Sequence, residues 1–177
     1  VAPVTRLAVA LALVASVALA GCDWSAYGYD ARHTSSNPTE TAIGPAEVAA
    51  LEPVWSVPTG SNVDGTQSPA IAGGVVVAGT SVAHDDGTYG GTLRAVSAAT
   101  GDELWVHELD HVAVPPALAH GLVYVGGGCN AAGGPATVRA LDLRTGAPRW
   151  EAALPAPVCG PPAVAAGRLY VPTRAFP

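Results

Sequence analysis

A block of eleven residues occurs twice in this chain of 177 residues and constrains its fold more than any other feature. Residues 95–105 and 140–150 both follow the pattern A-x-[S/D]-x-x-x-G-x-x-x-W, displaced by 45 residues. Self-similarity at a fixed spacing indicates a unit smaller than a domain, which stacks on copies of itself to bury its apolar faces. The pattern positions are Ala95, Ser97, Gly101 and Trp105 in the first copy and Ala140, Asp142, Gly146 and Trp150 in the second.

A second matching stretch precedes each block and extends the repeat. It covers residues 68–79, 115–126 and 161–172, so that a third copy begins near the end of the sequence. Its proline recurs at intervals of 47 and 46 residues. This spacing is typical of one four-stranded blade of a β-propeller.

Each copy is predicted to form four short strands and no helix. In the first copy we expect the strands at residues 70–72, 75–78, 92–96 and 104–105, with a glycine-rich loop before the third. The second strand is apolar at successive positions, as in residues 122–125, which predicts that both of its faces are covered. Thr100-Gly101 and Thr145-Gly146 predict tight turns, because glycine accepts a positive φ without steric cost. The tryptophan after each turn is expected to fill the gap between blades.

These residues resemble the propeller repeats of pyrroloquinoline-quinone-binding-like (PQQ-like) proteins, whose tryptophan-docking motif is A-x-D-x-x-x-G-x-x-x-W. The second copy matches this motif fully, whereas Ser97 replaces the aspartate in the first. The resemblance extends from about Trp24 onward and implies an all-β propeller of four-stranded blades, here an incomplete ring of about two and a half blades. The family includes quinoprotein alcohol dehydrogenases, polyvinyl-alcohol-dehydrogenase-like proteins and a cofactor-free lipoprotein scaffold of outer-membrane protein assembly. The motif is therefore specific for fold and poorly specific for function.

The amino terminus is typical of an exported chain. An apolar run at residues 7–19 follows Arg6 and is shorter than the ~20 residues that a membrane span needs. Leu-Ala-Gly-Cys at residues 19–22 resembles the lipobox of bacterial lipoproteins, which implies that residues 1–21 are a signal peptide and that Cys22 carries the lipid. The alternative is an ordinary secretory signal followed by a chance cysteine. We expect an extracytoplasmic protein that is lipid-anchored to a bacterial membrane.

The remaining chain divides into a lead-in and a propeller. Residues 22–52 are expected to hold the lipid anchor, a tether and a short helical lead-in, because Pro45 opens a segment with apolar residues three apart. Residues 53–177 are assigned to the propeller repeats. Within them, residues 53–57 are expected to form an outer strand of a further blade.

The charge of the mature chain excludes one class of partner. Residues 22–177 contain seven arginines, no lysine and fourteen acidic residues, which gives a formal charge of −7. Nucleic-acid binding relies on basic side chains that neutralise phosphates, so it is not expected here. The chain also has no polybasic patch for membrane contact, so a lipid would have to anchor it.

Two cysteines remain once Cys22 is assigned to the lipid. Cys129 lies in the loop between the second and third strands of one blade, and Cys159 precedes the prolines that open the next. In an up-and-down blade these two loops lie on the same face, so an exported protein is expected to join them by a disulfide. The alternative is two unpaired thiols.

Three short motifs suggest chemistry that their context does not support. His107-Glu108-Leu109-Asp110-His111 matches the zinc-protease pattern H-E-x-x-H, but the pattern requires a helix and the equivalent segment of the next copy contains prolines. Residues 126–131 resemble a dinucleotide fingerprint without the helix that it needs. Residues 84–86, His-Asp-Asp, could hold a cation through oxygen ligands, although a solvated loop tip is the simpler interpretation.

These observations favour a membrane-anchored propeller that acts as a binding or assembly scaffold for a protein partner, as the amino-terminal fragment of a larger ring. The alternative is the front of a PQQ-dependent, polyvinyl-alcohol-dehydrogenase-like oxidoreductase. PQQ and calcium would then bind in the missing blades, because the adjacent cysteines and calcium-site aspartate of such enzymes have no match here. A short open stack completed by self-association and a degraded gene product are further alternatives. We expect no catalytic, cofactor-binding or metal-binding residue within this sequence.

Overall fold

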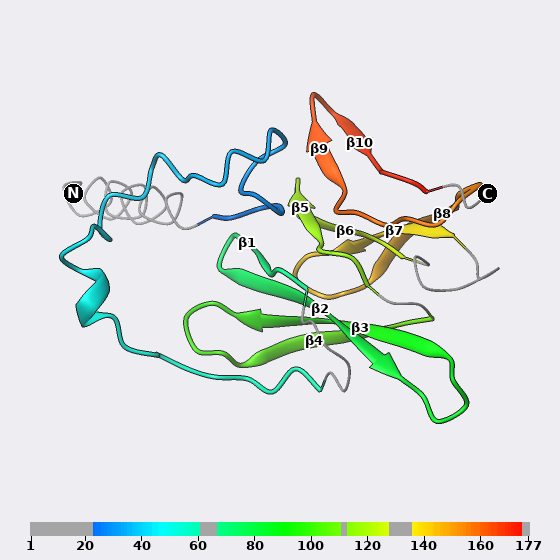
Figure 1. Ribbon diagram of the computed structural model, residues 1–177, viewed down its shortest axis with the longest axis horizontal. Coiled ribbons are helices and arrows are strands. Elements are labelled where there is room, and N and C mark those ends of the chain that lie inside the picture. Colours follow the sequence, from blue (N-terminus) through cyan, green and yellow to red (C-terminus); the bar gives the residue numbers. More distant parts are fainter. Residues whose placement is uncertain (1–22, 61–66, 111–112, 128–135, 175–177) are drawn as a thin grey trace, which may run out of the picture.

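A computed structural model of the chain describes residues 23–60, 67–110, 113–127 and 136–174. These residues form ten strands in three antiparallel sheets and one turn of 3-10 helix, η1 (Val48–Ala50), with no α-helix among them (Figure 1). In the described part of the chain, no helix has the length and apolar character needed to span a membrane. The expected signal peptide (1–21), Cys22 and Cys129 lie outside the described residues.

Two four-stranded sheets, hereafter blades 1 and 2, repeat the same topology. Blade 1 has the strand order β1-β2-β3-β4 and contains β1 (Ala70–Ala72), β2 (Val75–Ala83), β3 (Tyr89–Ser97) and β4 (Glu103–Leu109). Blade 2 has the order β5-β6-β7-β8 and contains β5 (Ala117–Ala119), β6 (Leu122–Gly126), β7 (Thr137–Asp142) and β8 (Pro148–Ala153). A two-stranded sheet follows, with β9 (Ala163–Ala165) and β10 (Arg168–Tyr170). The prediction of an incomplete, all-β propeller with four-stranded blades is confirmed.

The two blades also share an irregularity that sequence patterns do not reveal. In blade 1 the register between β3 and β4 shifts between Ala95 and Val96, and in blade 2 the register between β7 and β8 shifts between Ala140 and Leu141. Both shifts lie at the start of the repeated block. A bulge at this point increases the local twist just before the turn that the block encodes.

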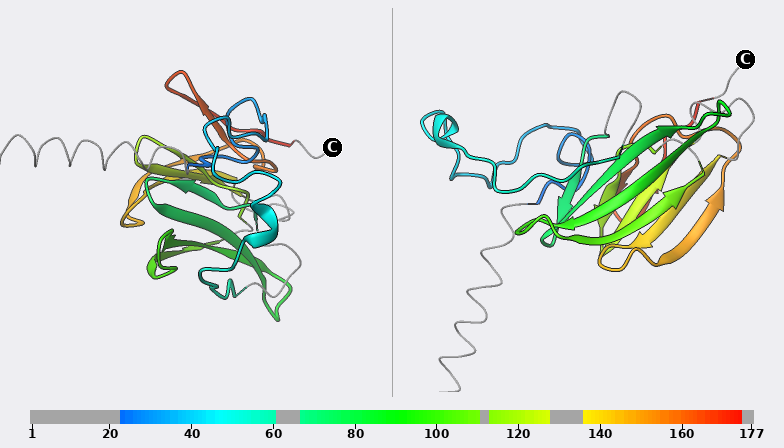
Figure 2. Two further views of the ribbon diagram at one scale, coloured as in Figure 1. Left: turned by 90° about the vertical axis from the view of Figure 1, so that its left-hand side faces the viewer. Right: turned by 90° about the horizontal axis from the view of Figure 1, so that it is seen from below.

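The core of the molecule lies between the two blades, which are stacked face to face (Figure 2). Val77 and Leu93 of blade 1 and Val123 and Leu141 of blade 2 are fully buried in one cluster. Alternate residues of a strand point to opposite faces of its sheet. One face of each blade therefore forms the seam, and the other is left for a neighbour on its far side.

Two expectations about the strands are wrong in part. The glycine-rich segment before β3 is mostly strand, because β2 and β3 stay paired as far as Ala83 and Tyr89. The second strand of blade 2 is not covered on both faces: Val123 and Val125 are fully buried, whereas Leu122 and Tyr124 are only half-buried. The adjoining unit contributes just two strands among the described residues, so it covers that face incompletely.

The lead-in differs from the prediction in one respect. Residues 51–60 form no strand, because no partner strand lies beside them among the described residues. The expected short helical segment is present as the single 3-10 turn η1. The described residues directly after Cys22 are hydrogen-bonded to both blades. Trp24 exchanges two backbone hydrogen bonds of 2.8 Å with Ile71 of β1, and the carbonyl of Ser25 accepts one from Leu118 of β5.

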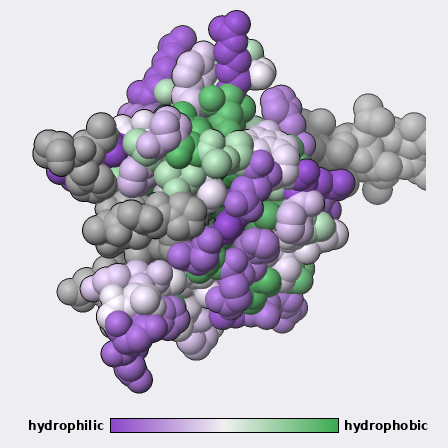
Figure 3. All heavy atoms as spheres, turned by 90° about the vertical axis from the view of Figure 1, so that its right-hand side faces the viewer, coloured by the Kyte–Doolittle hydropathy of each residue, from purple (hydrophilic) through white to green (hydrophobic). Residues whose placement is uncertain are grey.

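The blades have two distinct ends. One end, hereafter the turn face, carries the turns at Gly73-Gly74, Thr100-Gly101, His120-Gly121 and Thr145-Gly146. The lead-in extends from this end (Figures 1 and 2). The opposite end, the loop face, carries the β2–β3 loop at residues 84–88. Viewed from that end, the surface is hydrophilic over much of its area, with a hydrophobic area towards the middle (Figure 3).

Candidate functional site

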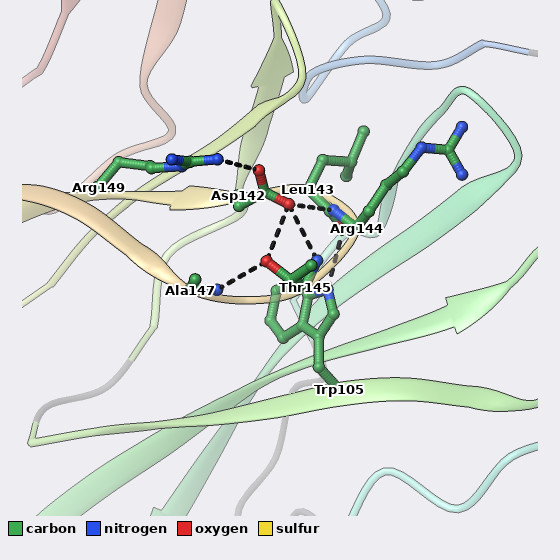
Figure 4. A network of polar contacts seen from close by, with 7 residues as sticks. All are labelled: Trp105, Asp142, Leu143, Arg144, Thr145, Ala147 and Arg149. Atoms are coloured by element: carbon green, nitrogen blue, oxygen red, sulfur yellow. Dashed lines mark hydrogen bonds and ion pairs between the residues drawn. The ribbon is translucent and has the colours of Figure 1, made fainter.

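The polar residue of the repeated motif organises a turn. The Asp142 carboxylate accepts hydrogen bonds from the backbone N–H groups of Arg144 and Thr145, both at 3.0 Å, and from the Thr145 hydroxyl (Figure 4). Its second oxygen lies 2.7 Å from the guanidinium of Arg149. The bonds from Arg149 and then Thr145 lower the pKa of Asp142 to about 2. The carboxylate is thus fully used in shaping the β7–β8 turn.

The first copy of the motif makes the same backbone turn with weaker side-chain support. Gly101 donates its N–H to the Ser97 carbonyl at 2.8 Å, as Gly146 does to the Asp142 carbonyl at 2.9 Å. The Ser97 hydroxyl accepts a single long bond of 3.3 Å from the Thr100 N–H. Asp102 accepts a 2.7 Å bond from the Thr100 hydroxyl and supplies the carboxylate that position 97 lacks.

Trp105 makes the contact that joins blade 1 to blade 2. It points from β4 onto the β7–β8 turn, where its indole Nε1 donates a 2.9 Å hydrogen bond to the Leu143 carbonyl. Its side chain is buried, with 7% of the residue exposed. Gly146 has a φ of +70°, and a Cβ at that position would lie 2.7 Å from Cδ2 of Trp105. The motif glycine therefore provides both the turn and the flat surface on which the indole of the preceding blade rests.

Trp55 makes the equivalent contact with blade 1, which the sequence reasoning missed. Its Nε1 donates a 3.1 Å hydrogen bond to the Ala98 carbonyl in the β3–β4 turn. A Cβ on Gly101 would lie 2.8 Å from Cδ2 of Trp55, which is close to the 2.7 Å between a Cβ on Gly146 and Cδ2 of Trp105. The available signal was a tryptophan about one repeat length before Trp105. Residues 53–57 therefore occupy the position of the last strand of a preceding blade, without a sheet to join.

Trp150 occupies the same position in blade 2 but is not docked on another turn among the described residues. It remains 41% exposed, and its ring lies 6.1 Å from that of Tyr124 on the same face of the blade. This face is the one that β9 and β10 cover incompletely.

An apolar cavity of about 240 Å³ opens on the outer face of blade 1. Trp55 and Val57 form one wall, and Val76, Ala78 and Val96 form the other. The Arg94 side chain borders the same cavity and pairs with Glu103. Its buried Nε has no hydrogen-bond partner within the described part of the chain. Both outer faces of the two-blade stack thus expose groups that suit a further blade.

A second cavity, of about 310 Å³, lies where β4 meets β7 and β8. Arg139 lines it and pairs with Asp110 at 3.1 Å and with Glu151 at 2.8 Å. Burial lowers the pKa of Arg139, but its hydrogen bonds and charge contacts with these two carboxylates outweigh burial and raise it. Burial, followed by the charge of Arg139, lowers the pKa of the neighbouring His107. The cluster is an ion-paired seam between the blades.

The described residues of the short motifs are not placed together in a catalytic or metal-binding arrangement. His107 and Glu108 are neighbours on strand β4, so they do not share the helical face that H-E-x-x-H requires, and His111 lies outside the described residues. In the 84–88 loop the Asp86 carboxylate accepts two bonds from Thr88, which lower its pKa. Within the described ranges, no three His, Cys, Asp or Glu side chains are placed to hold a metal ion.

The quinone that gives the repeat family its name does not fit either of the two cavities beside Trp55 and Arg139. The quinone is a polycarboxylate and requires cationic partners. The guanidinium of Arg139 is already engaged by Asp110 and Glu151, and the cavity beside Trp55 presents mainly apolar groups.

The cysteines are only partly described. Cys159 is disulfide-bonded. Cys129 lies outside the described residues, so its pairing with Cys159 stays a prediction, as does lipidation of Cys22.

Comparison with known proteins agrees with this geometry. The family model described as "Outer membrane protein assembly factor BamB", a model of the PQQ-type repeat, matches residues 89–175. No curated protein matches the chain. The matched range begins with β3 and includes the whole of blade 2, and the Trp-on-turn contact recurs on both blades. The chain is a PQQ-like β-propeller repeat protein.

Proposed function

We propose that this chain is a lipid-anchored, extracytoplasmic scaffold for binding or assembling other proteins. The observation that carries the proposal is the use of the motif side chains. Asp142 is engaged by Arg149 and its own turn, and Trp105 is engaged by the next blade. The polar group of the motif thus shapes a turn, its tryptophan joins two blades, and neither takes part in a reactive cluster among the described residues.

The family match supports the scaffold class. The matching model is described as an assembly factor of outer membrane proteins, which is a role in protein assembly. Repeat architectures stack small units into broad surfaces that suit protein partners. The lipobox at residues 19–22 supports attachment of the mature chain to a membrane through Cys22.

We further propose that additional blades complete the ring. Trp150 is 41% exposed on one outer face, and on the other the cavity beside Trp55 is apolar and the Arg94 Nε is buried without a partner among the described residues. A blade on the first face would offer Trp150 a turn like that at Gly146. A strand on the second would fill the cavity and offer Arg94 an acceptor.

Two measurements test this function. Mass spectrometry of the amino-terminal peptide, isolated from bacterial membranes, should find a diacylglyceryl group on Cys22, and a Cys22→Ala variant should stay out of the membrane fraction. Separately, the purified protein should give no alcohol-dependent dye reduction after incubation with PQQ and calcium. Dye reduction that depends on both additions would overturn the scaffold in favour of a quinoprotein oxidoreductase.

A further inference from the structure

We propose that residues 23–26 clamp the propeller directly onto its lipid anchor, so that the turn face and the lead-in lie against the bilayer surface. This inference rests on the proposed lipidation of Cys22. It replaces the picture of a propeller on a loose tether with one held in a fixed orientation. The loop face and the outer edges of the blades would then be the surfaces available to a protein partner.

The first support is the pairing of the residues that follow the anchor. Trp24 forms a two-way backbone pair with Ile71 of blade 1, and the Ser25 carbonyl accepts a 2.7 Å bond from Leu118 of blade 2. Ala26 is buried. Residues 24 and 25 thus bridge the innermost strands of both blades, as an added strand does at a sheet edge.

The second support is the short distance between the anchor and the turn face. The Asp23 carboxylate accepts a 3.1 Å bond from the N–H of Gly73 in the β1–β2 turn. Asp23 also lines a cavity with His120 and Arg144, which belong to two turns of blade 2. Consecutive Cα atoms are about 3.8 Å apart, so a lipid on Cys22 would be attached one residue before the contact between Asp23 and the turn face.

The third support is the apolar character of the lead-in beside the anchor. Ile43, Val48 and Leu51 are 50%, 57% and 58% exposed, and Tyr27 and Val54 are exposed as well. The segment that carries them extends from the turn face, away from the carboxyl-terminal end of the chain (Figure 2). Apolar side chains of this kind are stabilised at the boundary between headgroups and acyl chains.

The charge of the lead-in fixes the kind of membrane contact. Its acidic residues Glu40, Glu47 and Glu52 accompany the apolar side chains, and the mature chain contains no lysine. Attraction to anionic headgroups therefore does not drive the contact. We expect it to form on a zwitterionic phosphatidylcholine bilayer and to persist at high salt.

The test uses single lysines as label sites, since the chain has none. Ala49→Lys places a fluorophore on the lead-in, Ala147→Lys on the turn face and Asp85→Lys on the loop face. All three positions are exposed, and the nine-residue strand β2 separates the two faces by about 30 Å. The lipidated chain with its wild-type sequence, labelled in the same way, gives the background from the amino terminus.

Each labelled protein is reconstituted in phosphatidylcholine vesicles that carry a headgroup quencher. We expect quenching at positions 49 and 147 to exceed that at position 85 at least several-fold. Equal quenching at all three positions in protein with a lipidated Cys22 would overturn the orientation alone. An unlipidated Cys22 in the mass spectrum would overturn both the anchor and the orientation. Quenching at position 147 without quenching at position 49 would overturn the bilayer contact of the lead-in and point to another blade or a second copy as its cover.

A variant pair tests the clamp itself. Trp24→Pro removes the N–H that bonds to Ile71, whereas Trp24→Ala keeps both backbone bonds. The difference in quenching between positions 147 and 85 should collapse in Trp24→Pro and persist in Trp24→Ala. An unchanged difference in Trp24→Pro, with a native circular dichroism spectrum, would show that residues 23–26 do not orient the propeller.

Discussion

Trp105 and Leu143 belong to different blades, and the indole Nε1 of Trp105 donates a 2.9 Å hydrogen bond to the Leu143 carbonyl. Trp55 and Ala98 repeat this relationship one blade earlier, with a bond of 3.1 Å. Each tryptophan combines a large apolar ring with one donor, so it fills a seam and also satisfies a turn carbonyl that the seam buries. The contact therefore fixes both the distance and the rotation between adjacent blades.

Removal of the buried indole of Trp105 should lower the free energy of unfolding far more than removal of the exposed indole of Trp150. Trp105→Ala is expected to lower the free energy of unfolding by about 3–5 kcal/mol, and Trp105→Phe by about 1–3 kcal/mol, because phenylalanine fills the seam but leaves the Leu143 carbonyl without its donor. Trp150→Ala should cost about 1 kcal/mol, since its ring contacts only Tyr124 among the aromatic groups described. Urea denaturation measures all three. A cost for Trp150→Ala equal to that of Trp105→Ala would mean that a further blade covers Trp150.

The motif glycine is expected to be irreplaceable for two separable reasons. Gly146 and Gly121 have φ values of +70° and +74°, so alanine at either position is strained by about 1–2 kcal/mol. A Cβ at Gly121 meets nothing within 4 Å, whereas one at Gly146 meets Trp105 at 2.7 Å. Gly146→Ala should therefore cost at least about 1 kcal/mol more than Gly121→Ala.

A double-mutant cycle checks the origin of this excess. When alanine also replaces Trp105, the penalty of Gly146→Ala should fall to that of Gly121→Ala, because the clashing ring is gone. If the two substitutions lowered the free energy of unfolding additively, the proposed contact between Gly146 and the indole of Trp105 would be contradicted.

The Asp142 turn should make stability depend on acid pH. The pKa of Asp142 is about 2 in the folded chain against an ordinary value of 3.8, so the folded state favours its ionised form. This contribution is complete above pH 3.8 and is lost as the pH falls towards 2. Asp142→Asn should flatten the dependence of the unfolding free energy on pH across this window. Ser97→Ala should leave that pH dependence unchanged, since no carboxylate is removed.

His107 should add a second pH dependence nearer neutrality. Burial and then the charge of Arg139 lower its pKa below the ordinary value of 6.5, so the unfolded chain binds the proton more readily. Stability should therefore fall as the pH drops from 6.5 towards the lowered pKa and stay level above 6.5. His107→Gln should remove this slope, as measured by thermal unfolding in a pH series. If the wild type, but not the His107→Gln variant, lost stability as the pH rose above 6.5, the coupling would have the opposite sign to the one predicted.

The predicted disulfide can be mapped directly. Non-reducing peptide mass spectrometry should recover Cys129 linked to Cys159, and Cys129→Ser, Cys159→Ser and the double variant should each lose the same ~2–4 kcal/mol, because either change opens the same loop. Recovery of Cys159 linked to Cys22 would contradict both this pairing and the lipid anchor.

Several features of the candidate site could be anticipated from residue spacing, and others could not. The recurrence of Gly101 and Gly146 before a tryptophan was enough to predict turns and seams, because a positive φ and a large apolar ring have few other uses at a fixed interval. Trp55 lacked the surrounding pattern, so its role became visible only when its indole was placed on the Gly101 turn. The Arg139 cluster was also hidden, since Asp110 follows β4 of blade 1 whereas Glu151 lies on β8 of blade 2.

The sequence by itself determined the repeating unit, the class of fold and the turns, because these depend on local backbone preference and on apolar periodicity within one blade. Only the tertiary structure decided which face of each blade is buried, what Trp55 and Trp105 contact, and how residues 23–26 bridge two blades. Those outcomes depend on contacts between residues at least 38 positions apart, whose geometry is set by the stacking of whole sheets. The repeat therefore specified the strands and turns of each blade, and the packing between blades specified which surfaces of the protein are exposed.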